Sequence, residues 1–348
     1  MNPFQRKTLG RSDLVVPEVC LGTMTFGEQT DESDAHAQLD FALAAGINFI
    51  DTAEMYAVPS RPETSGASEA IVGRWLKRQA RDKILIATKV AGPSRNLDWI
   101  RKGPLALDRA NIRAAVDGSL QRLQTDYIDL YQIHWPARNQ PMFGQWQYDP
   151  AKERESTPIR ETLEALGELV GEGKIRHIGV SNEHPWGIMQ FVKWAEELGL
   201  PRIVSTQNAY NLISRTFESG LAETCHREQV GLLAYSPLAF GHLTGKYLRT
   251  ADAPGRLTQW PAFGQRYVKP NVVPAVTAYA ALAAKHGLTP IELALGFTRS
   301  RWFVASTIVG ASSLAQLRET LAATRTPMPQ ALLAEIDAIH LRYSNPAP

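Results

Sequence analysis

The stretch Ile47–Tyr56, INFIDTAEMY, runs without a spacer from an apolar segment into a carboxylate. Residues 47–50 are mostly apolar and partly β-branched, which is typical of a buried strand. Asp51 follows at once, and Tyr56 comes five residues later. Burying a charge without a partner is costly. We therefore expect the strand to end at Asp51 because the sheet opens there into a site.

The same arrangement of an apolar run followed by a helical pattern recurs along the chain. The expected strands are 19–24, 47–52, 83–90, 127–135, 174–182, 202–208, 230–238 and 303–312. The expected helices are 34–46, 67–80, 107–123, 159–173, 186–199, 217–229, 273–286, 290–300 and 313–324, and Thr289, Pro290 and Glu292 form a capping box. This alternation indicates a parallel sheet, and eight pairs in this length suit a closed (β/α)8 TIM barrel.

The alternative is an open, doubly wound α/β sheet, but G-x-G-x-x-G follows none of the strands. We expect one domain over residues 1–348, with a hairpin at 5–17 plugging the barrel bottom and an added helix at about 326–345. Long connections at 90–107, 136–158 and 239–271 each follow a strand, so they lie at the C-terminal face, where barrel sites are built. Whether these loops are ordered and closed stays open.

Composition restricts the class of protein. The 348 residues are 44% hydrophobic and 21% charged, with a net charge of +2, so they indicate neither a nucleic-acid nor a membrane partner. Cys20 and Cys225 suit a reducing compartment. The N-terminal stretch lacks the apolar core of a signal peptide, and no apolar run approaches a membrane span of about 20 residues. We expect a soluble cytoplasmic protein that acts on a small molecule; its oligomeric state stays open.

Four polar residues fall at neighbouring strand ends. Asp51, Lys89 and His134 end three consecutive strands, and Tyr56 follows the first of them. Each alone has an ordinary explanation as a cap, a strand lysine, a buried histidine or loop packing. Adjacent strands lie about 4.8 Å apart, so the side chains can meet over one mouth. Asp51 and Lys89 are expected to pair, and the positive charge lowers the pKa of Tyr56 toward that of a useful general acid.

This set resembles the catalytic tetrad of the aldo-keto reductase family, in "DTAEMY" (51–56), "ATKV" (87–90) and "YQIHW" (131–135). Further similar stretches, in the same order as in the family, are "LGTMTFG" (21–27), "IGVSN" (178–182), "QNAYN" (207–211), "YSPLAFGHLTGKY" (235–247) and "TIVGASSLAQL" (307–317). The loop 56–69 is longer than the usual Y-G-x-G-x-S-E, although it ends in a matching G-x-S-E. With the 136–158 loop, it resembles a bacterial subgroup of the shaker-channel-β-subunit-like branch.

The resemblance implies reduction of aldehydes or ketones to alcohols by hydride transfer, with NADPH as cofactor and Tyr56 as general acid. Lys89, paired with Asp51, tunes the phenol and stabilises the developing oxyanion. His134 orients the carbonyl. The expected substrate wall comprises Met24, Met55, Tyr56, His134 and Trp135. If apolar, this wall favours aromatic or medium aliphatic carbonyls.

The resemblance also implies that NADPH/NADP+ lies extended across the barrel mouth without a Rossmann fold. The nicotinamide would meet Ser181, Asn182 and Gln207 and stack on Tyr235; the phosphates would meet residues 236–246 and a helix N-terminus after 303–312. Arg256 matches a family arginine near the adenine, and Thr320 stands where many members have Asn. The full expected set is Gly22, Thr23, Met24, Asp51, Ser181, Asn182, Gln207, Tyr235, Ser236, Pro237, Leu238, Gly241, Lys246, Arg256, Gly310, Ser312, Gln316, Glu319 and Thr320.

No acidic residue is clearly placed to prefer a free 2′-hydroxyl, which favours NADPH over NADH. Two rival functions remain. A nucleotide-binding regulatory or redox-sensing subunit with slow turnover would share the fold and the cofactor site. A metal-dependent barrel hydrolase using Asp51 and His134 is disfavoured, because the chain lacks H-x-H and its third strand ends in Lys89. We expect no metal site.

Overall fold

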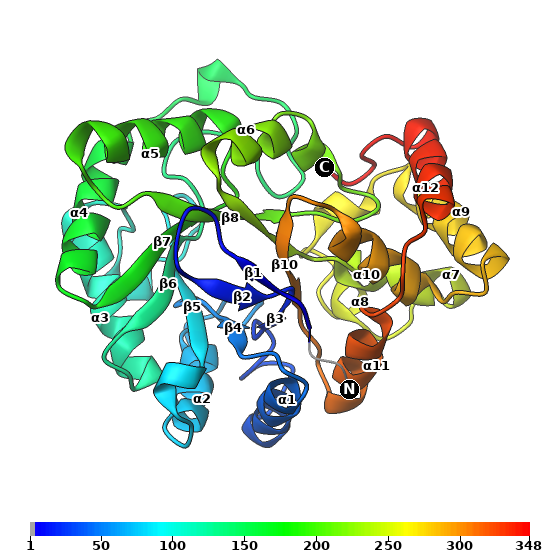
Figure 1. Ribbon diagram of the computed structural model, residues 1–348, viewed down its shortest axis with the longest axis horizontal. Helices are drawn as coiled ribbons and strands as arrows, with labels where there is room; N and C mark the ends of the chain where they lie inside the picture. Colours follow the sequence, from blue (N-terminus) through cyan, green and yellow to red (C-terminus); the bar gives the residue numbers. More distant parts are fainter. Residues whose placement is uncertain (1–3) are drawn as a thin grey trace.

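The computed structural model describes residues 4–348, and its centre is a closed barrel of eight parallel strands (Figure 1). Each strand pairs with its sequence neighbours, and the last closes on the first. The (β/α)8 prediction is therefore confirmed and the open sheet is wrong. The strands are β3 (Val19–Gly22), β4 (Phe49–Asp51), β5 (Leu85–Val90), β6 (Ile128–Ile133), β7 (Ile175–Ser181), β8 (Ile203–Ala209), β9 (Gly231–Tyr235) and β10 (Val304–Val309).

Helices surround the barrel (Figure 1). They are α1 (Glu32–Ala44), α2 (Ala67–Leu76), α3 (Arg109–Leu123), α4 (Ile159–Gly171), α5 (Pro185–Leu198), α6 (Leu221–Glu228), α9 (Val272–Lys285), α10 (Pro290–Ser300) and α11 (Leu314–Ala323). The capping box at α10 is confirmed, since Thr289 N–H donates to Glu292 Oε2 at 2.8 Å and Glu292 N–H to Thr289 Oγ1 at 3.2 Å.

One expected helix, 217–229, is divided. A short 3-10 turn, η4 (Thr216–Glu218), precedes α6. Ser219 and Gly220 separate the two because neither has helical dihedrals, and Gly220 has a φ of +105°. The positive φ suits glycine, which has no Cβ to clash.

The two additions to the barrel are also present. β1 (Arg6–Thr8) and β2 (Val15–Pro17) form an antiparallel hairpin, drawn in dark blue across the barrel in Figure 1. Leu9 and Leu14 of this hairpin belong to one buried cluster with barrel residues such as Phe49 and Leu130, so the hairpin closes the barrel floor. At the other end of the chain, α12 (Gln330–Arg342) packs on α9.

The three long connections are folded segments. Residues 90–107 contain η2 (Ile100–Lys102), and residues 136–158 contain η3 (Pro150–Lys152). Residues 239–271 contain η5 (Ala239–Thr244), α7 (Lys246–Arg249), α8 (Arg256–Gln259) and η6 (Gln265–Val268). Lys269 Nζ donates to the Gly144 carbonyl at 2.6 Å, which ties the third connection to the second.

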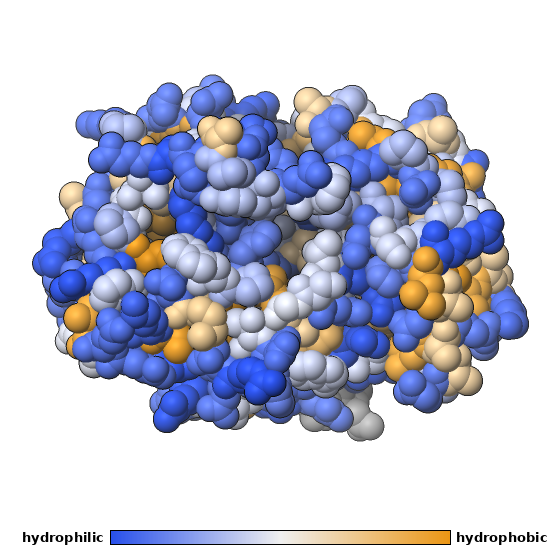
Figure 2. All heavy atoms as spheres, turned by 90° about the horizontal axis from the view of Figure 1, so that it is seen from above, coloured by the Kyte–Doolittle hydropathy of each residue, from blue (hydrophilic) through white to orange (hydrophobic). Residues whose placement is uncertain are grey.

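The surface is largely polar on the face shown in Figure 2, where apolar side chains occur in small scattered groups. Over residues 4–348, the helices are too short or too polar to cross a membrane. Cys20 and Cys225 are buried free thiols.

Candidate active site

Asp51 and Lys89 form a buried ion pair at the barrel mouth. Asp51 ends β4, and Lys89 lies on the adjacent strand β5. Lys89 Nζ donates to Asp51 Oδ2 at 2.6 Å and to the Thr52 carbonyl at 2.7 Å, and its side chain is 0% exposed. The other carboxylate oxygen, Oδ1, accepts from Gln207 Nε2 at 2.8 Å and from Gln132 Nε2 at 3.1 Å. Both charges are therefore compensated, as a buried pair requires.

Tyr56 lies between Lys89 and His134. Lys89 Nζ is 4.8 Å from the Tyr56 ring centroid, and the His134 ring lies 5.6 Å away, nearly perpendicular at 79°. Burial raises the pKa of the Tyr56 phenol, and the opposing effect of Lys89 is smaller. The expectation of a net lowered pKa is therefore wrong, because desolvation outweighs the ammonium charge. For Lys89, burial alone would lower the pKa, but Asp51 and Tyr56 together raise it.

His134, directly after β6, is 8% exposed. Burial, then Lys89, then Arg95 hold its pKa well below the usual value. Within residues 4–348 its Nδ1 has no hydrogen-bond partner. A neutral imidazole carries one N–H donor and one acceptor. His134 can thus offer a hydrogen bond to a neutral ligand oxygen without itself being charged.

This neutral state predicts a pH effect on stability. In the unfolded chain His134 binds a proton below about pH 6.5. In the folded protein its pKa is lower, so His134 becomes protonated only at a lower pH. The contribution of His134 to the unfolding free energy is therefore lost as the pH falls below about 6.5, by up to about 1.4 kcal/mol per pH unit. Denaturant titrations of wild type and His134→Gln from pH 7 to 5 measure it. The unfolding free energy of wild type should exceed that of His134→Gln by less as the pH falls from 7 to 5. A difference that does not change with pH would contradict the neutral state of His134.

A cavity of about 1530 Å³ opens above these residues, at the C-terminal ends of the strands. Every predicted site residue lines it except Lys89, which is fully buried. The structure thus brings together the predicted catalytic, cofactor and substrate residues around one cavity. A typical pocket for a drug-sized ligand is about 300–1,000 Å³, so this cavity has room for more than one small molecule.

The motif Gly66–Glu69 anchors α2 beside this cavity. Ser68 Oγ donates to the Thr23 carbonyl at 2.5 Å and to Thr23 Oγ1 at 2.9 Å. Glu69, also buried, accepts from Thr88 Oγ1 and from Arg122 Nε. The G-x-S-E motif, which ends the loop that contains Tyr56, is therefore attached to the end of β3 and to β5.

The polar residues predicted for the nicotinamide bind one another. Tyr235 Oη donates to Asn182 Oδ1 at 2.7 Å, and Asn182 Nδ2 donates to the His134 carbonyl at 2.9 Å. Ser181 Oγ donates to the Gln207 carbonyl at 2.7 Å. This network holds the side chains at the cavity wall, while the Gln207 amide is engaged with Asp51. Their contacts with a cofactor stay a prediction.

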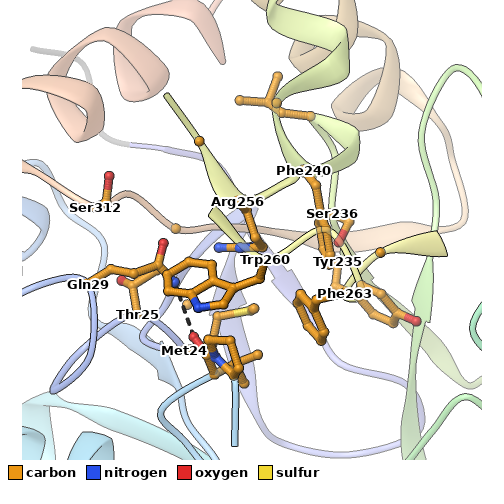
Figure 3. Close-up of a pocket in the computed structure, with 18 of the residues that line it drawn as sticks. Met24, Thr25, Gln29, Tyr235, Ser236, Phe240, Arg256, Trp260, Phe263 and Ser312 are labelled. Carbon is orange, nitrogen blue, oxygen red and sulfur yellow. Dashed lines mark hydrogen bonds between the residues drawn. The ribbon is translucent and has the colours of Figure 1, made fainter. Parts of the chain in front are cut away.

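The segment after β9 supplies cations to the cavity. Ser236, Phe240 and Gly241 have positive φ values of 55°, 55° and 94°, and the last two interrupt the helical dihedrals of η5. Lys246 Nζ donates to the Pro254 carbonyl at 2.9 Å, and the Arg256 guanidinium lies 4.5 Å from the Phe240 ring centroid. Figure 3 shows Phe240, Arg256, Trp260 and Phe263 reaching into the cavity, with Met24 and Gln29 opposite. The predicted adenine contact of Arg256 stays a prediction.

The N-terminus of α11 also lines the cavity, through Ser312 and Gln316. Ser313 caps this helix by accepting from Gln316 N–H. Ser312 Oγ and N–H donate to Gln316 Oε1 at 3.0 and 3.2 Å. A Cβ on Gly310 would lie 3.0 Å from the Gly22 carbonyl oxygen, so the two strand ends approach closely where glycine permits it.

Sequence reasoning missed several residues of the cavity wall. Phe263 packs beside Tyr56 together with the predicted Met24 and Met55, although it is more than 200 positions away along the chain. Arg95 and Phe143 also line the cavity. Arg95, Phe143 and Phe263 each lie in one of the three long connections, whose length was the available signal. Which of their side chains face the cavity depends on contacts between loops, and these have no sequence periodicity.

Comparison with known sequences now agrees with this geometry. The sequence profile of the aldo/keto reductase family matches residues 18–341. The chain belongs to this family. It is 50% identical over 347 residues to "Protein tas" of Escherichia coli (strain K12), covering 99% of this chain and 100% of the relative.

Two less similar relatives bear functional names. "NADH-specific methylglyoxal reductase" of Escherichia coli (strain K12) is 32% identical over 332 residues, covering 90% of this chain and 92% of the relative. "Probable voltage-gated potassium channel subunit beta" of Oryza sativa subsp. japonica is 31% identical over 332 residues, covering 92% and 91%. The protein is thus an aldo/keto reductase-type oxidoreductase, and carbonyl reduction is the general activity that its family supports.

Proposed function

We propose that this protein reduces aldehydes or ketones to alcohols with NADPH, and that Tyr56 is the proton donor. The observation that carries the proposal is the position of the Tyr56 phenol, between the buried ammonium of Lys89 and the neutral ring of His134. When bound, NADPH supplies the hydride for the carbonyl carbon.

Each residue of the site then has a distinct task. Tyr56, protonated because of its raised pKa, gives its proton to the carbonyl oxygen. Lys89 stabilises the phenolate that this leaves, while Asp51 keeps the ammonium in place. His134 donates its N–H to the carbonyl oxygen and holds it near Tyr56.

The residues present fit an extended dinucleotide. Lys246 and Arg256 supply positive charge for phosphates, and the buried Arg256 Nε has no hydrogen-bond partner within residues 4–348. Ser312 and Gln316 offer polar groups at a helix N-terminus of the same cavity. Ser181 and Asn182 would hold the nicotinamide amide, and Tyr235 would support its ring. We place the protein in the cytoplasm, whose reducing conditions suit its free thiols.

Preference for NADPH over NADH is part of the proposal. It needs a test of its own, because a relative is named as NADH-specific. Gln316→Glu adds a negative charge beside Ser312, where the 2′-phosphate would lie. We expect it to weaken NADPH binding about tenfold or more and to change NADH binding by less than about threefold, as one charge repulsion of about 1.4 kcal/mol requires. Fluorescence titration of both nucleotides measures this, with Gln121→Glu on α3 as control. Equal losses for the two nucleotides would argue against a phosphate site at Ser312.

A regulatory subunit with slow turnover is the second candidate, because a relative is named as a potassium channel subunit beta. NADPH oxidation against a panel of aldehydes and ketones, with identification of the alcohol, separates the two. Rapid turnover supports the reductase. Tight binding of NADPH without turnover supports the regulatory subunit.

A hydrolase that uses Asp51 as a metal ligand is not supported by the geometry. Both oxygens of the carboxylate already accept hydrogen bonds, from Lys89, Gln132 and Gln207. Across residues 4–348, no three His, Cys, Asp or Glu side chains are grouped so as to hold a metal ion.

A further inference from the structure

Arg95 stands in the first long connection, six residues after Lys89, and lines the same cavity. Its guanidinium carbon lies 4.2 Å from the Phe143 ring centroid and 5.3 Å from that of Trp135. The Trp135 ring is itself fixed, because it is buried and its Nε1 donates to the Pro93 carbonyl at 2.9 Å. Two aromatic rings that follow β6 thus position one cation at the cavity wall.

The charge of Arg95 has no anionic partner in the part of the chain that the structure describes. No hydrogen bond or ion pair involves Arg95 within residues 4–348, although its contacts with the two rings are present. The carboxylates of Glu28 and Asp51, which also line the cavity, pair with Arg61 and Lys89. Burial lowers the pKa of Arg95, and the opposing influence comes from the Tyr235 phenol. The N–H edge of the guanidinium is therefore free for a ligand.

Arg95 lies close to the residues proposed to hold the carbonyl. Its charge contributes to lowering the pKa of His134. The Trp135 ring that it contacts is 4.8 Å, centroid to centroid, from the His134 ring. An anion on Arg95 would therefore be separated from the carbonyl site by roughly the width of one aromatic side chain, which is the reach of a small substrate.

The other cationic side chains that line the cavity belong to a different segment of the chain. Lys246, Arg249, Arg256 and Arg266 all belong to the segment 239–271, beside the groups proposed for the cofactor. Among the lysines and arginines within residues 4–348 that line the cavity, only Arg95 comes from outside that segment. This separation leaves Arg95 for the substrate.

We propose that Arg95 binds the carboxylate of the substrate, so that the protein acts on aldehydes or ketones that also carry a carboxylate. This inference rests on the proposed carbonyl reduction. A guanidinium is planar and can donate two parallel hydrogen bonds to a carboxylate, while its faces stay stacked on aromatic rings. One guanidinium matches the single charge of a carboxylate. The substrate wall would then carry a cation beside its apolar side chains, so the sequence-based preference for apolar carbonyls, which was conditional on an apolar wall, would not hold.

The test compares acids with neutral partners of nearly the same shape. The probes are 3- and 4-carboxybenzaldehyde and their methyl esters, with kcat/KM measured for wild type, Arg95→Met and Arg95→Lys. In wild type we expect at least one acid to exceed its ester by about 10- to 100-fold, the range for a hydrogen bond to a charged group. Arg95→Met should abolish that preference and leave the esters within about threefold. Arg95→Lys should restore part of it.

Arg227→Met is the matched control, because Arg227 is 71% exposed on α6 and does not line the cavity. This variant should leave kcat/KM unchanged for both acids and both methyl esters. A fall of equal size for acids and esters in Arg95→Met would show a structural role and overturn the proposal. Wild-type turnover without preference for either acid would overturn it too.

A binding measurement separates this proposal from the reductase assignment. Calorimetric titration with 3- and 4-(hydroxymethyl)benzoate, the alcohols of the two acids, uses the protein with and without NADP+. Binding to wild type that weakens about tenfold or more in Arg95→Met supports the carboxylate site, even if no aldehyde is turned over and the reductase assignment fails. Absence of binding, or equal binding to both proteins, overturns the carboxylate site while leaving turnover of the esters to support carbonyl reduction.

Discussion

Tyr56→Phe is expected to slow carbonyl reduction by at least about 10²- to 10⁴-fold, the usual value of general acid catalysis. The substitution removes only the hydroxyl, so the ring keeps its packing beside Met24, Met55 and Phe263. The proton donor is lost, while the groups proposed to bind NADPH are untouched. We therefore expect the dissociation constant of NADPH to change by less than about threefold.

The measurement is steady-state turnover and NADPH titration on the same preparations. Tyr343→Phe is the control, because Tyr343 follows α12 and does not line the cavity. It should keep wild-type kinetics. Turnover in Tyr56→Phe within about tenfold of wild type would remove Tyr56 from the role of proton donor.

Lys89→Met is expected to lower both turnover and stability. Loss of a donor that stabilises transition-state charge costs about 10²- to 10³-fold in turnover. Removing one member of a buried pair costs about 3–5 kcal/mol of unfolding free energy, because the other charge stays buried. Here Asp51 is 2% exposed and would keep only its hydrogen bonds from Gln132 and Gln207.

The double variant Asp51→Asn, Lys89→Met separates the two effects. It removes the unpaired carboxylate, so much of the lost stability should return, as in buried pairs that are replaced by neutral groups. Turnover should stay low because the ammonium is still missing. Denaturant unfolding and kinetics on the single and double variants provide the comparison. Wild-type stability in Lys89→Met would contradict a buried, charge-compensated pair.

Much of the fold was predictable from the sequence, because each strand ends in a recognisable change of composition. Asp51, Lys89 and His134 follow apolar runs, and in a parallel barrel such ends share one mouth. Knowledge of the barrel was therefore enough to bring these residues together. Tyr56 joins them because it lies in the loop that follows Asp51, and the family resemblance supports its role as general acid.

Other features depend on three-dimensional contacts. The direction of the Tyr56 pKa is a balance between burial and charge, and burial is known only once Met24, Met55 and Phe263 surround the ring. The pairing of Arg95 with Phe143 joins two separate connections. Neither relation follows from spacing along the chain, because loops of this length can cross in many ways.

The most direct test of the account is a single-turnover experiment on the wild-type protein. Protein saturated with NADPH is mixed with excess 4-carboxybenzaldehyde or its methyl ester, and nicotinamide absorbance and alcohol formation are followed together. The account predicts that the bound NADPH is oxidised and that one equivalent of alcohol appears, faster than any release of unchanged NADPH. NADPH that stays bound and reduced with these and the other carbonyls of the panel would contradict the reductase and support a nucleotide-binding regulatory subunit.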